Sequence, residues 1–157
     1  MKPEEILAKP ARVLSQQQRE DYFDSGYLLL PEFLKRDWLD RIREVSAVFV
    51  EQSRARTKSD SMFDIEPTHS VDAPKLRRLS FPVDHHEVFR ELAFNSPIVD
   101  VAEDLLGPNV CYHHSKLNFK WSGGGEEIKW HQDIQYWPHT DFSPLTIGIY
   151  IEDVDDE

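Results

Sequence analysis

The residues best suited to chemistry stand near the C-terminal end, in Lys129-Trp130-His131-Gln132-Asp133. On an extended backbone, side chains alternate between two faces, so His131 and Asp133 would project from the same face. One imidazole nitrogen and one carboxylate oxygen could then bind the same cation. Two histidines and one carboxylate are the ligand set of non-haem Fe(II) oxygenases, and two of those three ligands are available here. His-X-Asp alone is also common among ordinary surface and core residues, so its context has to decide.

The composition indicates one soluble, globular domain over residues 1–157. The chain has 157 residues, of which 39% are hydrophobic and 30% charged, enough to form a real core. With 18 Lys and Arg against 29 Asp and Glu, the formal charge is −11. Such an acidic protein repels phosphate backbones and anionic lipid, so we expect neither nucleic acid nor a membrane as partner.

Cysteine use and the N-terminus predict a cytoplasmic protein. Cys111 is the only cysteine in the sequence, which excludes an internal disulfide and fits a reducing compartment. We interpret it as a small, buried hydrophobic residue. No apolar run approaches the length of a membrane span, and the first residues lack the apolar region of a signal peptide.

Residues 1–108 have the patterns of a mainly helical part. Ser15 and Gln18 match a capping box, which predicts a helix through about Asp24 that ends at Gly26. Ser96 is the expected N-cap of a later helix that closes at Gly107. The other expected elements are a short buried strand at 27–30, a helix at 36–54 with an apolar stripe, a long loop at 57–76 and a helix at about 85–94.

Residues 109–157 change to a period of two, which is typical of strands. Lys116, Asn118 and Lys120 fall on one face of the first strand, and Leu117 and its apolar neighbours fall on the other. A basic strand face in an acidic protein favours an anionic ligand. A glycine-rich turn at 122–125, a strand at 126–133 that carries the His-X-Asp motif, and a buried strand at 144–151 would follow.

Together these segments resemble the phytanoyl-CoA dioxygenase family of Fe(II)- and 2-oxoglutarate-dependent oxygenases. The similarity runs from about Leu14 to the end of the chain. Three segments carry its most specific part: Leu-Leu-Gly-Pro-Asn-Val at 105–110, His-His-Ser-Lys-Leu-Asn at 113–118 and Trp-His-Gln-Asp at 130–133. They stand in the order and approximate spacing of the family.

The resemblance implies an α+β fold in which helices flank a double-stranded β-helix, a jelly-roll or cupin-like barrel, incomplete in this chain. It implies that His131 and Asp133 bind Fe(II), and that Lys120, with Asn118, helps to hold 2-oxoglutarate. The activity would be hydroxylation of a small organic substrate by O₂, with 2-oxoglutarate converted to succinate and CO₂. Halogenating relatives replace the carboxylate ligand, so the presence of Asp133 favours a hydroxylase.

One departure from the family pattern leaves alternatives open. In the family, a distal histidine ligand and an arginine for 2-oxoglutarate follow further strands, whereas here no arginine follows Arg90 and no histidine follows His139. We therefore expect the chain to be the N-terminal part of a longer protein. The alternatives are a catalytically silent member of the fold that acts as a binding protein, and a cupin-like metal enzyme that does not use 2-oxoglutarate. The sequence defines neither the substrate nor the oligomeric state.

Overall fold

The computed structural model describes residues 2–122, 129–136 and 143–153. The chain divides into two compact units. The first comprises Met1–Lys35, Leu92–Tyr112 and Gln132–Glu157, and the second comprises Arg36–Glu91 and His113–His131. Helix α5 (Glu87–Asn95) crosses from the second unit into the first.

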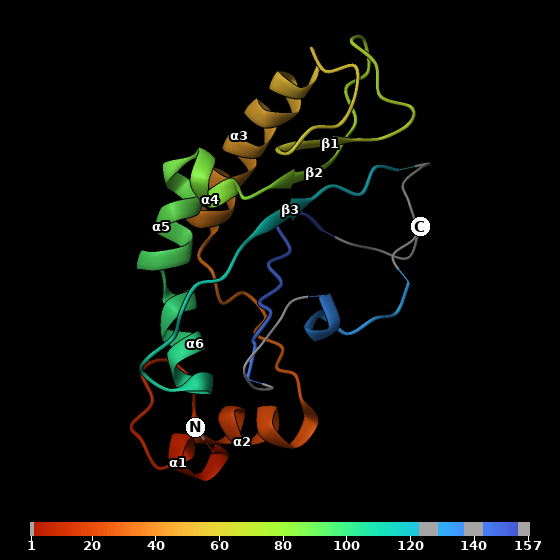
Figure 1. The fold of residues 1–157 in the computed structure, drawn as a ribbon. Coiled ribbons are helices and arrows are strands. Elements are labelled where there is room, and N and C mark those ends of the chain that lie inside the picture. The colour runs from red at the N-terminus through yellow and green to blue at the C-terminus, as the bar shows by residue number, and fades with distance from the viewer. Residues whose placement is uncertain (1, 123–128, 137–142, 154–157) are drawn as a thin grey trace. The chain divides into compact units, whose positions relative to one another are not determined.

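The first unit is helical. It contains α1 (Pro3–Leu7), α2 (Gln16–Ser25), α6 (Pro97–Leu106) and the 3₁₀ helix η1 (Asp133–Tyr136), and α6 contacts both α1 and α2 (Figure 1). Its core is formed by Leu14, Val101 and Leu105. Partly buried side chains pack around this core: Tyr22, Leu28, Leu30, Phe33 and Leu145.

The ends of α2 and α6 confirm the predicted caps. Ser15 accepts a hydrogen bond from the backbone N–H of Gln18, and the Gln18 side chain closes the capping box. Gly26 ends α2 with a φ of 79°, a left-handed conformation that glycine adopts without steric cost. Ser96 caps α6 by accepting from the N–H of Ile98, and Gly107 follows the last turn.

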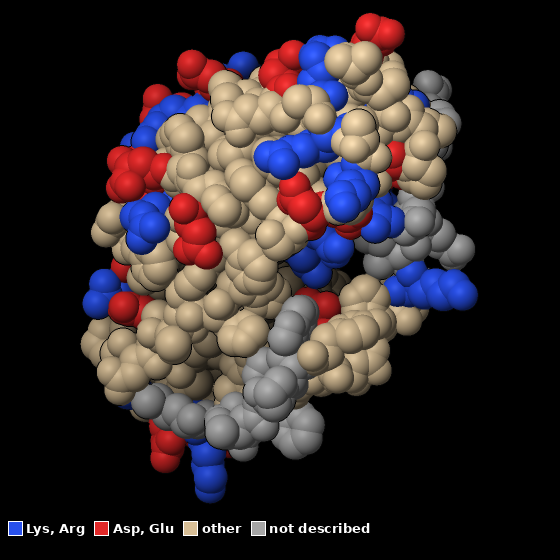
Figure 2. Space-filling model, turned by 45° about the horizontal axis from the view of Figure 1, so that its top comes forward, with Lys and Arg blue, Asp and Glu red and all other residues tan. Residues whose placement is uncertain are grey.

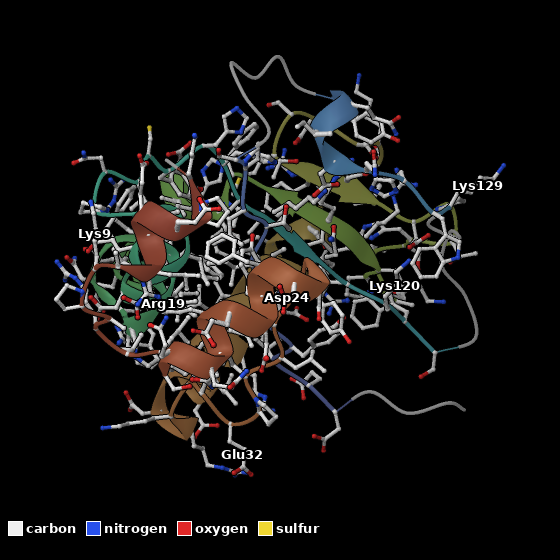
Figure 3. All side chains as sticks on the ribbon, turned by 90° about the horizontal axis from the view of Figure 1, so that it is seen from below. Lys9, Arg19, Asp24, Glu32, Lys120 and Lys129 are labelled. Carbon is white, nitrogen blue, oxygen red and sulfur yellow. The ribbon has the colours of Figure 1, made fainter. Side chains whose placement is uncertain are left out.

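Asp104 on α6 anchors the N-terminal segment of the first unit. Its carboxylate accepts hydrogen bonds from three successive backbone N–H groups, those of Arg12, Val13 and Leu14, at 2.8 to 3.0 Å. The buried side chain of Arg19, which extends from α2 (Figure 3), donates to the backbone oxygens of Asp104, Lys9 and Ile6. Polar contacts therefore fasten residues 6–19 to α6 around the small apolar core.

The second unit packs helices against a small sheet. It contains α3 (Arg36–Ser53), α4 (Pro82–His85), the first part of α5, and strands β1 (Phe63–Ile65), β2 (Leu76–Ser80) and β3 (Lys116–Asn118). The strands are antiparallel in the order β1-β2-β3, with α3 beside them (Figure 1). The Phe49 ring of α3 lies 6.3 to 6.4 Å from the rings of Phe63 and Phe89, centroid to centroid, and this cluster is the unit's core.

The register of the sheet separates an apolar face from a polar face. Phe63, Leu79 and Leu117 pair across the three strands, and Phe63 and Leu79 are at most 1% exposed. Because directly paired residues share a face, the neighbouring row of Asp64, Arg78 and Asn118 lies on the opposite side of the sheet. The polar face therefore lies away from the Phe49 cluster.

A β-bulge interrupts the pairing of β1 with β2. Asp64 pairs with Arg78, whereas the next residue, Ile65, pairs with Leu76, so Arg77 is one extra residue on β2. A bulge places two residues opposite one and re-aims their side chains. Both Arg77 and Arg78 consequently reach the single carboxylate of Asp64.

Several sequence predictions about local structure are wrong. Residues 27–30 form no strand, since Leu28 and Leu30 pack against a helical core while Leu29 is 75% exposed. The loop expected at 57–76 contains β1 and ends at the first residue of β2. Cys111 is exposed rather than buried. Each error comes from packing between distant segments, which outweighs local composition.

The predicted strands after β3 also differ from the structure. Residues 144–151 carry no strand, and Ile147 and Tyr150 are exposed. The strand expected at 126–133 is not formed over its described part, because Asp133 begins η1, and residues 123–128 lie outside the described residues. The α+β class is compatible with the structure. The described residues contain three strands, fewer than the roughly eight of a jelly roll, so they do not display a double-stranded β-helix.

Candidate functional site

The polar sheet face carries both residues expected to hold 2-oxoglutarate. Asn118 lies in β3, opposite Arg78 of β2. Lys120 lies just beyond β3 (Figure 3), where the hydrogen bond from the N–H of Phe119 to the oxygen of Arg77 continues the ladder. Lys116, Asn118 and Lys120 are exposed, while Leu117 and Phe119 between them are partly buried. The predicted alternation of this segment is confirmed, and it presents an amide and two ammonium groups on one face.

The apolar side chains that flank Lys120 are held by a hydrogen bond and by ring stacking. The indole N–H of Trp121 donates to the backbone oxygen of Leu76 at 2.7 Å. The Phe119 and Trp121 rings stack at 6.1 Å between centroids, inclined by 10°. These contacts hold the backbone on either side of Lys120.

Asp64 is the acidic member of the polar face and was not singled out by the sequence. Burial opposes ionisation of Asp64, but hydrogen bonds from Arg77 and Ser59 and the charges of Arg77 and Arg78 outweigh it, so its pKa lies below the usual range. The carboxylate is therefore ionised at neutral pH and offsets one of the neighbouring positive charges. No local pattern marks Asp64, because it joins this row only through the pairing of β1 with β2.

His131 lies in the second unit and is exposed. Its Nδ1 lies 2.7 Å from the backbone oxygen of Lys129. A carbonyl oxygen only accepts hydrogen bonds, so Nδ1 is the donor in this contact, and Nε2 is the nitrogen that could bind a metal. A hydrogen bond from one ring nitrogen to a carbonyl is the usual way to orient the other nitrogen toward a metal.

Asp133 lies in the first unit, at the first residue of η1, and is partly buried. Its Oδ2 accepts a hydrogen bond from the Thr146 hydroxyl at 3.1 Å. A carboxylate supported in this way can still use an oxygen lone pair on a cation. Thr146, thirteen residues further along the chain, is a supporting residue that the sequence did not indicate.

Within the described ranges, no group of three or more His, Cys, Asp or Glu side chains could hold a metal ion. His139, which follows the motif in sequence, lies outside those ranges. The described residues thus show the local supports of the two predicted ligands and no third ligand.

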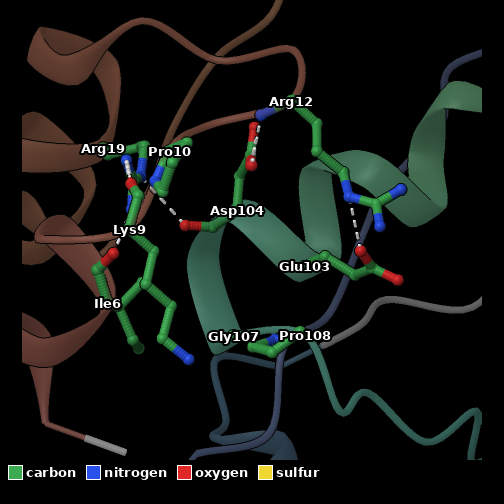
Figure 4. Close-up of a pocket in the computed structure, with 9 residues that line it drawn as sticks. All are labelled: Ile6, Lys9, Pro10, Arg12, Arg19, Glu103, Asp104, Gly107 and Pro108. Atoms are coloured by element: carbon green, nitrogen blue, oxygen red, sulfur yellow. Dashed lines mark hydrogen bonds and ion pairs between the residues drawn. The ribbon is translucent and has the colours of Figure 1, made fainter.

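A small pocket in the first unit is not this site. It lies where the N-terminal segment meets α6 (Figure 4), and none of the predicted ligands or 2-oxoglutarate residues lines it. Arg12 closes one side with ion pairs to Asp100 at 2.9 Å and Glu103 at 2.7 Å. The volume is about 60 Å³, room for a few water molecules rather than for a substrate.

Basic and acidic side chains are interspersed over the face seen in Figure 2, and no large region of one charge is visible there. In the part of the chain that the structure describes, no helix combines the length and apolar character that a bilayer span requires.

The comparisons establish the class of the protein. The model of the phytanoyl-CoA dioxygenase family matches residues 22–157. The chain belongs to this family, as its motifs predicted, and the family's relatives include α-ketoglutarate-dependent dioxygenases.

Individual relatives act on different compounds. The chain is 30% identical over 146 residues to a probable alpha-ketoglutarate-dependent hypophosphite dioxygenase of Stutzerimonas stutzeri, covering 92% of this chain and 50% of the relative. It is 31% identical over 122 residues to a methylphosphonate hydroxylase of Gimesia maris, covering 76% and 44%. It is 36% identical over 78 residues to an L-proline trans-4-hydroxylase of Streptomyces griseoviridis, covering 47% and 29%. The chain thus spans half or less of the length of these relatives.

Proposed function

We propose that the polypeptide carrying this chain is an Fe(II)- and 2-oxoglutarate-dependent dioxygenase that hydroxylates a small molecule. The observation that carries the proposal is the family match across residues 22–157, which includes the His-X-Asp motif. Hypophosphite, methylphosphonate and L-proline, the compounds in the relatives' names, are small and carry an anionic group. A small-molecule substrate and a cytoplasmic location remain part of this proposal.

His131 and Asp133 would supply two of the three protein ligands to Fe(II). The donor set fits the metal, because Nδ1 of His131 donates to a backbone oxygen and thereby orients Nε2, and Asp133 is supported by a hydroxyl. Iron with bound 2-oxoglutarate and O₂ supplies the oxidant for hydroxylation, and 2-oxoglutarate leaves as succinate and CO₂. The third ligand is not among the described residues.

Lys120 would bind one carboxylate of 2-oxoglutarate as a compact positive charge, and Asn118 would donate an amide N–H to the same molecule. Both side chains belong to the polar sheet face, where the stacked Phe119 and Trp121 fix the backbone. The work of these residues is to orient the co-substrate, because a rigid strand holds them at little further cost in conformational entropy.

Two other functions make different predictions. A silent member of the family, acting as a binding protein, would bind no Fe(II) and would not depend on His131 or Asp133. A cupin-like metal enzyme of another kind would bind a metal through the same two residues. Its activity, however, would be independent of 2-oxoglutarate and of Lys120.

An anaerobic titration with Fe(II) and 2-oxoglutarate tests the proposal. The intact polypeptide should develop the visible charge-transfer absorption of an iron-bound 2-oxo acid. His131→Ala and Asp133→Ala should abolish the band, and Lys120→Ala should raise the 2-oxoglutarate concentration needed for half of it. His69→Ala is the matched control, because His69 is a histidine of the same unit whose Nδ1 accepts from the N–H of Lys75.

The outcomes separate the three functions. A band that survives His131→Ala would refute the ligand assignment. Metal binding without any band, and with no effect of Lys120→Ala, would favour the cupin-like enzyme. A protein that binds no Fe(II) would favour the silent member.

A further inference from the structure

Two consecutive arginines of β2 are held differently by the same carboxylate. Arg77 donates from Nε and Nη2 to Oδ2 of Asp64, at 3.0 and 2.7 Å. Arg78 donates to that oxygen through Nη2, at 2.9 Å. The Nε of Arg78 is buried and has no hydrogen-bond partner among the described residues. A buried donor without an acceptor costs about 1–3 kcal/mol, so an acceptor supplied by a ligand would recover that free energy.

The β-bulge directs Arg78 toward the face that carries Asn118. The two residues are direct partners in the register of β2 and β3, and Cα atoms in such pairs lie about 5 Å apart. Lys120 lies two residues beyond Asn118, roughly 7 Å further along the extended chain. Arg78 therefore lies on the same face as the proposed 2-oxoglutarate residues and directly opposite one of them, Asn118.

The charge of this face favours an anion. Among the described residues of the three strands and Lys120, the polar row and its neighbours carry four cationic residues, Arg77, Arg78, Lys116 and Lys120, and the carboxylate of Asp64. The chain as a whole has a formal charge of −11, so these four cationic residues are opposite in sign to its net charge. A guanidinium is planar and carries parallel N–H donors, which suit the two oxygens of a carboxylate, phosphonate or phosphinate group.

We propose that Arg78 is a specificity-determining residue that binds the oxoanion group of the primary substrate. The proposal rests on the proposed function, in which Lys120 and Asn118 hold 2-oxoglutarate. Arg78 contributes its Nε–H to the substrate while Asp64 holds Nη2 and fixes the plane of the guanidinium. Arg77, with both Nε and Nη2 on Asp64, keeps a structural role.

Binding of small oxoanions to the intact, metal-free polypeptide tests this role. The probes are methylphosphonate, hypophosphite and L-proline, measured by isothermal titration calorimetry. Arg78→Gln should weaken the binding of the tightest probe at least about tenfold, the loss of one charged hydrogen bond. Arg78→Lys should fall between wild type and Arg78→Gln. Asp64→Asn should tighten binding, because it removes the competing carboxylate.

Arg77→Gln is the matched control, since it removes the same charge from the neighbouring position and breaks two contacts with Asp64. It should change probe binding less than about threefold, and thermal unfolding should show that each variant is folded. Affinity for 2-oxoglutarate, measured separately through the charge-transfer band, should be the same in Arg78→Gln and wild type.

Three results would overturn the proposal. The first is unchanged probe binding in Arg78→Gln, and the second is binding of none of the three probes by the wild-type protein. The third is an equal loss of probe and 2-oxoglutarate affinity, which would assign Arg78 to the co-substrate. If the wild type forms no charge-transfer band yet binds a probe through Arg78, the proposed oxygenase function fails while the anion site stands.

Discussion

Asp104 and Asp133 are both partly or fully buried carboxylates of the first unit, yet they are surrounded very differently. Asp104 is 4% exposed and accepts three backbone N–H groups from one stretch of chain. Asp133 begins a short 3₁₀ helix and accepts from the hydroxyl of Thr146, a residue in a segment without regular structure. A carboxylate whose oxygens accept several backbone N–H groups, like that of Asp104, is suited to fixing the chain. A carboxylate oriented by one side-chain hydroxyl, like that of Asp133, is suited to binding a cation.

The largest expected effect is on stability, and it separates the two carboxylates. Asp104→Ala leaves three backbone donors without their acceptor and should lower the free energy of unfolding by about 4 kcal/mol. Asp133→Ala should lower it by less than about 1 kcal/mol. Urea unfolding followed by circular dichroism measures both. Equal losses for the two variants would mean that Asp104 and Asp133 contribute equally to stability.

Acid should lower the stability that Asp104 contributes. Burial opposes ionisation of Asp104, but backbone hydrogen bonds from Leu14, Val13 and Arg12 and the charge of Arg19 outweigh it, so its folded pKa is lowered. A lowered folded pKa stabilises the protein above the unfolded value of about 3.9, and this stability is lost as pH falls through the folded pKa. The unfolding free energy should therefore drop below about pH 4.

Asp104→Asn is the variant that tests this origin of the acid sensitivity. It should flatten the dependence of the unfolding free energy on pH, while the lowered pKa of Asp64 keeps part of the slope. A slope identical to that of wild type would place the acid sensitivity elsewhere.

A smaller effect is expected at the support of Asp133. Thr146→Val keeps the shape of the side chain and removes the hydroxyl that donates to Asp133. If Asp133 binds Fe(II), loss of this outer hydrogen bond should weaken Fe(II) binding about tenfold. Anaerobic metal titration measures the affinity, and Thr57→Val is the control, because Thr57 is an exposed threonine of the second unit. A stability loss without any change in Fe(II) affinity would make Thr146 purely structural.

The smallest expected effect concerns the N-cap of α2. Ser15→Ala removes the side-chain oxygen that accepts from the N–H of Gln18, and should cost about 1 kcal/mol of stability. Thermal unfolding measures the loss, and Ser15→Asp, which keeps an acceptor, should retain most of the stability. A neutral Ser15→Ala would mean that the contacts of Asp104 and Arg19 hold this region without help from the cap.

Helices and their caps could be predicted from the sequence because their determinants are local. Ser15, Gly26 and Ser96 act within one turn of their own position, and the apolar stripe of α3 has the helical period. The 27–30 strand failed for the opposite reason. Its leucines have β-like composition, but Leu28 and Leu30 are partly buried against Leu14, Val101 and Leu105, which are distant in the sequence.

The alternation of the segment that carries Asn118 and Lys120 could be predicted, and its surroundings could not. The period of two placed Lys116, Asn118 and Lys120 on one face correctly. Arg78 joins that face by pairing with Asn118 of β3, and Asp64, from a segment interpreted as a loop, joins it by pairing with Arg78. Such pairing depends on contacts across about forty residues, which no local pattern encodes. The roles of His131, Asp133, Lys120 and Asn118 stay predictions.

The bulge at Arg77 allows the hairpin of β1 and β2 to gain or lose a residue. Leu76 and Leu79 are both 0% exposed although three positions separate them, a spacing that a regular strand would place on opposite faces. Without Arg77 the strand would be Leu-Arg-Leu-Ser, which alternates regularly and keeps both leucines in the core. A single-codon insertion or deletion can thus add or remove one charged side chain on the polar face and leave the phase of the hydrophobic residues intact.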